Sequence, residues 1–502
     1  MRMVNDMNVY FSDIFDVDPD VIEHYGAFNI SLINDLPLFI DPFLLFNSTK
    51  SGYQDLHKQI LDYVAFLRDK SIEQGIRQGL LKSWFIFSEV RQNWFGYSLV
   101  GNGGSGLGMD FAEALNRNLH TLFTDFGQET ITKSSHLEKL CLVKNGVGRD
   151  NISDFTVNLI KEYLLQYTQT FAQTYIDPTK CRTYKIPKVS FDFETALWNH
   201  GTFYLPSYNN DFVLLTPKDM LTKDETWINK SDIIDRFNNI MASVSNVELR
   251  DQMNFYFLAK LPPPKRKKNG RGTKAPLKSD IAAAISAVIS KYPVFIDYYI
   301  RYKEEHGEEA KSISKERVFE TQELFVTELS SFILSLFQES GFYETAADTL
   351  EEALQRVLFL KNVIENKDGY RIFYVKGQPI KRESDIQIMF RLTWFATPSD
   401  VSREANEGRG PVDFKISRGA ADKSLVEFKL ASNTKLRQNL EKQVEIYKRA
   451  HDTDKAIKAI LFFTDEEETK VRKVLSELGL AGEKYIVLID ARNDNKPSAS
   501  TA

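Results

Sequence analysis

The spacing of apolar and polar residues divides the chain into three regions with different predicted structure. Residues 1–259 mix segments of helical periodicity with short runs of strand-forming residues. The predicted helices are Tyr53–Asp69, Met109–Phe123 and Asn151–Tyr175, and the clearest strand-like runs are Trp94–Val100 and Phe212–Leu215. Nothing in this region repeats at a fixed period, so a solenoid is not expected. We expect an α+β domain here.

Residues 260–278 interrupt this pattern. They contain four prolines and eight basic residues but no acid, a composition that cannot bury itself. The segment is typical of a flexible linker, and the alternative is an arm that binds phosphate groups. Beyond it, residues 279–369 form a predicted helical segment. Its helices are expected from Ser279 to Lys291, where Pro293 interrupts, and over Glu316–Gln338 and Thr345–Ile364.

Residues 370–492 show a regular alternation of strands and helices. After Arg382 the predicted order is a helix, three strands, a helix, a strand, a helix and a strand. The bounds are Ser384–Phe395, Val401–Ala405, Val412–Ser417, Leu425–Ala431, Thr434–His451, Ala459–Thr464, Glu466–Leu478 and Tyr485–Asp490. The early strands suit an antiparallel meander and the later ones a parallel crossover. We expect an α/β domain with a mixed central sheet, then a flexible tail over 493–502.

Composition and charge narrow the functional classes. A chain of 502 residues exceeds one typical core, so a multidomain protein of mixed α+β and α/β structure is expected. The two cysteines, Cys141 and Cys181, are far apart and match neither a disulfide framework nor a zinc site. A formal charge of −5 gives no overall attraction to nucleic acid. Neither a signal peptide nor a long apolar run is evident, which predicts a cytoplasmic protein without a membrane segment.

Acidic residues inside two predicted strands are the most informative feature. Asp413 lies between Val412 and Phe414, although acids are depleted in strands and costly to bury without a partner. Glu427 and Lys429 are two residues apart, so they face the same side of their strand. Carboxylate oxygens suit Mg²⁺ or Mn²⁺, and such an ion can assist hydrolysis of a phosphodiester. The competing interpretation is an ordinary salt bridge at the edge of a sheet.

Asp413 after Gly410-Pro411, followed by Glu427-Phe428-Lys429, resembles the PD-(D/E)xK nuclease superfamily. The order of elements is similar too, although Val412 separates the proline from the aspartate. The resemblance implies a restriction-endonuclease-like fold, in which Asp413 and Glu427 bind the metal ion and Lys429 serves the attacking water. Gln443 and Tyr447 on the next helix resemble the Gln-x-x-x-Tyr extension of the RecB-like branch. An amphipathic helix explains the same two residues equally well.

The superfamily also places an acid before the first strand, and three residues are candidates. Asp385 is preferred because it shares a helical face with apolar residues, whereas Glu383 lies at the start of the helix and Glu404 on the first strand. Arg409, in the turn before Asp413, is the basic residue expected to contact substrate phosphate.

These features predict a Mg²⁺- or Mn²⁺-dependent deoxyribonuclease with a regulatory N-terminal region, an architecture that looks like restriction or phage-defence effectors. RNA stays open as a substrate, as do a homo-oligomer and a defence-system partner protein. The rival hypothesis is a catalytically silent module that binds nucleic acid or a partner protein.

Weaker signals favour structural roles. Gly101–Gly106 matches a phosphate-binding pattern without its other elements, and the aromatic residues between Trp84 and Tyr97 suit a core better than base stacking. A turn or helix cap explains Asp41.

Overall fold

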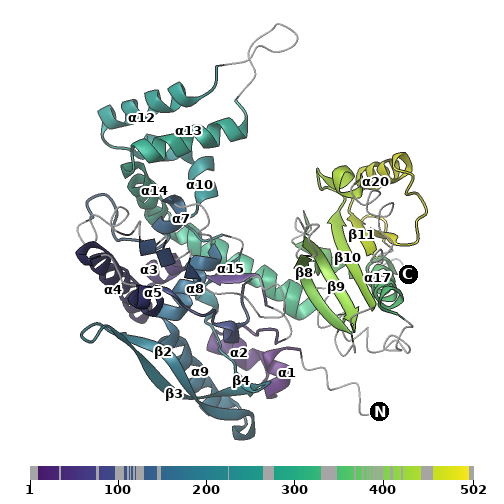
Figure 1. Ribbon diagram of the computed structural model, residues 1–502, viewed down its shortest axis with the longest axis horizontal. Helices are drawn as coiled ribbons and strands as arrows, with labels where there is room; N and C mark the ends of the chain where they lie inside the picture. Colours follow the sequence, from purple (N-terminus) through teal and green to yellow (C-terminus); the bar gives the residue numbers. More distant parts are fainter. Residues whose placement is uncertain are drawn as a thin grey trace.

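The computed structural model shows a multidomain protein of mixed α and β structure (Figure 1). It describes residues 9–32, 35–74, 78–96, 107–109, 112–113, 115–116, 119, 129–143, 149–223, 225–263, 276–328, 348–366, 369–375, 378–380, 383, 386–387, 390, 393–394, 399–406, 411–419, 422–441 and 456–496. An N-terminal body runs to about residue 328, and a C-terminal domain is built on a separate sheet. The predicted loop Gly101–Gly106 lies outside the described residues.

Helices form most of the N-terminal body. They are α1 (Phe11–Phe15), α2 (Pro19–Tyr25), α3 (Pro42–Phe46), α4 (Ser51–Gln74), α5 (Gln78–Phe85), α7 (Lys139–Val143), α8 (Arg149–Leu159), α9 (Lys161–Tyr175), α10 (Lys230–Asp235), α11 (Phe237–Ser243) and α12 (Val247–Lys260). The helix expected over Asn151–Tyr175 is broken at Ile160 into α8 and α9. The aromatic residues Trp84, Phe85 and Phe87 are buried in the core, as the sequence favoured.

The N-terminal body also contains two small sheets. Strands β1 (Leu38–Ile40) and β5 (Leu221–Lys223) pair antiparallel. Strands β2 (Cys181–Asp192) and β3 (Leu197–Tyr208) form a long hairpin, which β4 (Asp211–Phe212) extends and α9 covers. The pattern of apolar and polar residues did not predict this hairpin. Only part of the predicted strand Phe212–Leu215 is a strand, because β4 ends at Phe212.

The helical segment expected over 279–369 is shared between the two bodies. Helices α13 (Lys278–Lys291), α14 (Val294–Glu305) and α15 (Gly307–Gln322), with the π-helical turn Glu323–Glu328, belong to the N-terminal body. The Trp227 indole N–H donates to the Lys303 carbonyl at 3.0 Å, and the Tyr10 hydroxyl donates to the Phe325 carbonyl at 2.5 Å. Helix α17 (Thr349–Asn366) instead packs on the C-terminal sheet.

Helices α12 and α13 form a projecting hairpin on either side of the basic, proline-rich segment (Figure 1). No single helix in the described part of the chain is long and apolar enough to cross a membrane. Helices α13 and α14 pass that test only as a pair, and they are bent by 107° relative to each other.

The C-terminal domain contains a five-stranded sheet in the order β12-β11-β10-β9-β8. Its strands are β8 (Asp400–Asn406), β9 (Pro411–Arg418), β10 (Asp422–Leu430), β11 (Ala456–Phe462) and β12 (Ile486–Asp490). Pairing is antiparallel from β8 to β10 and parallel from β10 to β12, which confirms the mixed sheet expected from the sequence. A separate short ribbon pairs β6 (Tyr374–Val375) with β7 (Gln378–Pro379).

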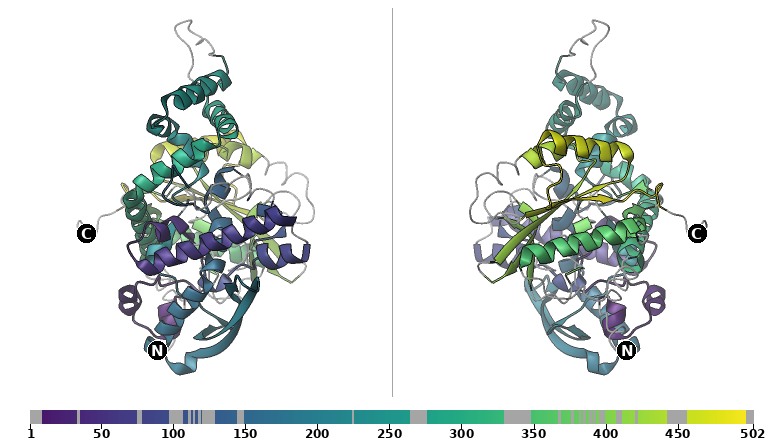
Figure 2. Two further views of the ribbon diagram at one scale, coloured as in Figure 1. Left: turned by 90° about the vertical axis from the view of Figure 1, so that its left-hand side faces the viewer. Right: turned by 90° about the vertical axis from the view of Figure 1, so that its right-hand side faces the viewer.

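The sheet of the C-terminal domain is covered on both faces. Alternate strand residues Phe414, Val426 and Phe428 are buried in the core that includes α17. Ile460 and Phe462 point to the other face, toward α20 (Asp465–Glu477). Figure 2 shows α17 and α20 on opposite sides of the sheet. The strands are therefore held between two apolar layers, and any charged group within them must find its own partners.

A fully buried acid connects distant parts of the N-terminal body. The Asp41 carboxylate caps α3 by accepting from the Phe43 amide at 3.0 Å, and it accepts from the Trp227 amide at 2.6 Å. This confirms the cap expected from the sequence. Glu138 is also fully buried, and its carboxyl group lies beside that of Asp41. Burial, together with the nearby charge of Asp41, raises the pKa of Glu138 well above its usual value.

Replacing this acid should therefore change the response of the protein to pH. A carboxyl group whose pKa is raised in the folded state destabilises the protein as the pH rises above the pKa of that group in the unfolded state. The free energy of unfolding then falls by up to about 1.4 kcal/mol per pH unit. Relative to wild type, Glu138→Gln should be more stabilising at pH 8 than at pH 5, because the amide cannot ionise. Urea unfolding followed by tryptophan fluorescence tests this, and a pH-independent difference between the two proteins would contradict it.

Candidate active site

Asp413 and Glu427 lie on neighbouring antiparallel strands. The register of β9 and β10 pairs Val426 with Phe414, and its continuation sets Glu427 opposite Asp413. Residues opposite each other in an antiparallel pair point to the same face of the sheet. One Asp413 carboxylate oxygen accepts from the Phe428 amide at 2.5 Å, which fixes the side chain against β10. The two acids predicted from the sequence are therefore brought together.

Lys429 forms ion pairs with two acids. Its ammonium nitrogen lies 3.2 Å from Glu427 Oε1 and 3.1 Å from Glu383 Oε2. The other Glu383 oxygen accepts from the Asn433 side-chain amide at 2.9 Å, so this acid is tied to the residues that follow β10. The structure thus places Glu383 in the site, whereas the sequence analysis preferred Asp385, which lies outside the described residues.

Lys458 is a member of the site that the sequence analysis missed. It lies on β11 directly opposite Glu427, is 3% exposed, and its ammonium nitrogen is 3.1 Å from Glu427 Oε2. Asp413, Glu427 and Lys458 therefore form a row across three adjacent strands. A single lysine inside the apolar run Ala456–Phe462 was the available signal, because a buried lysine requires a partner.

The charges of this row are strongly coupled. Burial raises the pKa of Asp413 to about 6, although Lys429 and the Phe428 amide oppose the shift. Burial also acts to raise the pKa of Glu427, but Lys458 and Lys429 outweigh it and the net pKa is lowered. Burial would lower the pKa of Lys429, yet Asp413, Glu427 and Glu383 raise it. Glu427 and Lys429 are thus kept charged, whereas the pKa of Asp413 lies close to neutral pH.

The donor set of the site fits a hard cation in part. Across the described residues, no group of three or more acidic, histidine or cysteine side chains has the geometry to hold a metal ion. Asp413 keeps one carboxylate oxygen clear of the Phe428 amide, and Glu427 lies opposite it. These oxygens are the ligand type that Mg²⁺ and Mn²⁺ prefer. Both Glu427 oxygens are ion-paired, so a cation there would compete with Lys429 and Lys458.

Four other predicted site residues cannot be placed. Arg409, Gln443 and Tyr447 lie outside the described residues, and of Glu404 the structure describes only the backbone, within β8. The site therefore consists, within the described chain, of Asp413, Glu427 and Lys429 with Glu383 and Lys458.

Comparison with known families identifies two matches. Residues 16–229 match the model of a domain of unknown function (DUF8370), and residues 349–465 match that of a second domain of unknown function (DUF8371). The second match contains Asp413, Glu427, Lys429 and Lys458. Neither a curated protein nor a solved structure matches the chain. The helices from α10 to the π-helical turn lie between the two matched segments.

The raised pKa of Asp413 predicts a pH-dependent effect of neutralising it. Because its folded-state pKa is about 6 and its ordinary value is 3.8, wild-type stability should fall as the pH rises through that window. Asp413→Asn keeps an oxygen for the Phe428 amide but removes the buried charge. The free energy of unfolding of the variant, relative to that of wild type, should therefore rise by about 2 kcal/mol between pH 4.5 and pH 7.5.

Urea unfolding in EDTA at the two pH values measures this difference. Glu483→Gln, at an exposed position of the same domain, serves as the control for removing a carboxylate outside the site. An equal effect of Asp413→Asn at both pH values would show that this carboxyl is not desolvated.

Proposed function

We propose that the C-terminal domain is a metal-dependent nuclease that hydrolyses DNA phosphodiester bonds. The observation that carries the proposal is the position of Asp413, Glu427 and Lys429 on one face of two paired strands, with a lysine ion-paired between acids. The order of these residues resembles that of the PD-(D/E)xK superfamily. A mixed sheet covered by α17 and α20 is consistent with the fold that this resemblance implies.

Each residue has a task that follows from its chemistry. Asp413 and Glu427 would hold Mg²⁺ or Mn²⁺, which when bound neutralises phosphate charge and activates water. Lys429, held charged by its acids, can donate hydrogen bonds to a phosphate oxygen or to the attacking water. Glu383 positions Lys429 through its ion pair, and Asn433 in turn fixes Glu383. Lys458 keeps Glu427 ionised and oriented toward the site.

The proposed setting is a cytoplasmic phage-defence or restriction effector. The large N-terminal body would then sense a signal or regulate cleavage, alone, as a homo-oligomer or with a partner protein. This part of the proposal rests on the resemblance and on the separation of the C-terminal domain from a larger body.

A second function is favoured by one specific observation. Both carboxylate oxygens of Glu427 are engaged by lysines, an arrangement that is also stable without a metal ion. A domain that retained this network for stability alone would bind nucleic acid or a partner protein without cutting it. The two functions differ in whether a divalent ion displaces the lysines.

Cleavage assays separate the two functions. With Mg²⁺ or Mn²⁺ the protein should cut DNA, and EDTA should abolish cutting. Asp413→Asn, Glu427→Gln and Lys429→Met should each lower the rate at least about 100-fold, because each removes a group that acts on the transition state. Lys423→Met, on the same strand but outside the site, is the matched control and should retain activity.

Plasmid, linear and single-stranded DNA, with RNA in parallel, identify the substrate. Preferential cutting of RNA would show that the substrate is RNA rather than DNA and would leave the proposed metal-dependent hydrolysis unchanged. Cutting that persists in EDTA or in Asp413→Asn would refute the proposed site, and binding without cutting under every condition would favour the silent module.

A further inference from the structure

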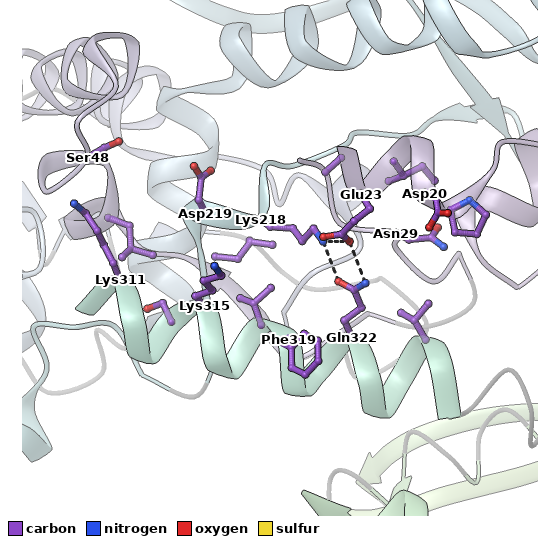
Figure 3. A pocket seen from close by; sticks show the side chains of 18 of the residues that line it. Asp20, Glu23, Asn29, Ser48, Lys218, Asp219, Lys311, Lys315, Phe319 and Gln322 are labelled. Carbon is purple, nitrogen blue, oxygen red and sulfur yellow. Dashed lines mark hydrogen bonds and ion pairs between the residues drawn. The ribbon is translucent and has the colours of Figure 1, made fainter. Parts of the chain in front are cut away.

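A large cavity lies in the N-terminal body, within the segment of the chain that precedes the C-terminal domain. Its volume is about 740 Å³, within the range of roughly 300–1,000 Å³ that is usual for small-molecule sites. One wall is a face of α15, and the opposite walls come from α2, the loop 48–50 before α4 and the short turn Lys218–Met220 (Figure 3). Segments from three distant parts of the sequence therefore enclose it.

The α15 wall combines aromatic and basic groups at helical spacing. Lys311, Lys315, Phe319 and Gln322 are separated by three or four residues, so they share one face of the helix. Phe319 is 58% exposed, whereas its neighbour Val318 is buried in the core. An exposed aromatic ring on the wall of a cavity offers a flat surface on which a planar ligand group can stack.

The charges in the cavity are not evenly distributed. Lys218 pairs with Glu23, and Lys50 pairs with Asp219 at 2.5 Å, so these acids are already neutralised. Lys315 has neither an ion pair nor a hydrogen bond to any residue that the structure describes, and Lys311 pairs only with the exposed Glu308. Free positive charge is thus concentrated on α15.

Figure 3 shows how these groups are ordered along the cavity. Lys311 and Lys315 rise from α15 at one end, Asp20 lies at the other end, and Phe319 lies between them. A phosphate would be attracted to the lysine end and repelled from the Asp20 end. An aromatic base attached to that phosphate would then reach Phe319.

From this arrangement we infer that the cavity binds a nucleotide, with the phosphates at Lys311 and Lys315 and the base stacked on Phe319. The site lies outside the acid and lysine cluster of the C-terminal domain and does not depend on the nuclease proposal. Binding of a nucleotide to the N-terminal body can be measured directly.

Titration calorimetry on the full chain tests the inference. The four ribonucleoside triphosphates and monophosphates are the probes, with inorganic tripolyphosphate and adenosine as partial ligands, all in EDTA to remove metal-bridged binding. At least one nucleotide should bind, and more tightly than either partial ligand. Phe319→Ala and Lys315→Glu should each weaken it tenfold or more.

Matched substitutions elsewhere act as controls. Phe255→Ala removes an aromatic ring that is 76% exposed on α12, and Lys473→Glu reverses an exposed charge on α20. Both should change the affinity less than twofold. The inference is overturned if no probe binds, if tripolyphosphate binds as tightly as the nucleotides, or if the control substitutions weaken binding as much as Phe319→Ala and Lys315→Glu. Thermal unfolding without ligand verifies that each variant is folded.

Discussion

Mutual neutralisation of charges on the C-terminal sheet is the constraint on which its site depends. Asp413, Glu427 and Lys458 occupy successive strands, and an isolated charge would be costly at the buried Lys458 and unfavourable at the half-buried Asp413 and Glu427. Lys429, near the end of β10, and Glu383, which precedes β8 in the chain, complete the compensation. The same pairing that makes the charges tolerable also holds two carboxylates opposite each other, which is the arrangement that metal-assisted phosphate chemistry needs.

Much of the C-terminal domain could be predicted because its strands alternate apolar and polar residues between clear turns. Asp413, Glu427 and Lys429 were recognisable because acids inside strands contradict the local preference of the sheet. Lys458 was not, since only the parallel pairing of β10 with β11 brings it opposite Glu427, and sequence spacing does not reveal which strands pair. The preference for Asp385 over Glu383 rested on the helical face alone, whereas the contact of Glu383 with Lys429 depends on tertiary structure.

The N-terminal body was harder to predict for a different physical reason. Its long hairpin β2–β3 is rich in polar and exposed positions, so it lacks the alternation that identifies a half-buried strand. The helical segment after the basic, proline-rich stretch was predicted as helical, but its division between two bodies depends on contacts such as Trp227 with Lys303. Residues more than seventy positions apart make those contacts, and helical periodicity carries no information about them.

Binding of Mn²⁺, followed by the loss of the free-ion signal in electron paramagnetic resonance, tests the central claim most directly because it requires no substrate. We expect the wild-type chain to bind Mn²⁺ at neutral pH and Asp413→Asn to abolish this binding. Lys458→Met should strengthen it, because one oxygen of Glu427 is then released from its ion pair. Absence of Mn²⁺ binding, or binding that is unchanged by Asp413→Asn, would contradict the claim that these acids form a metal site.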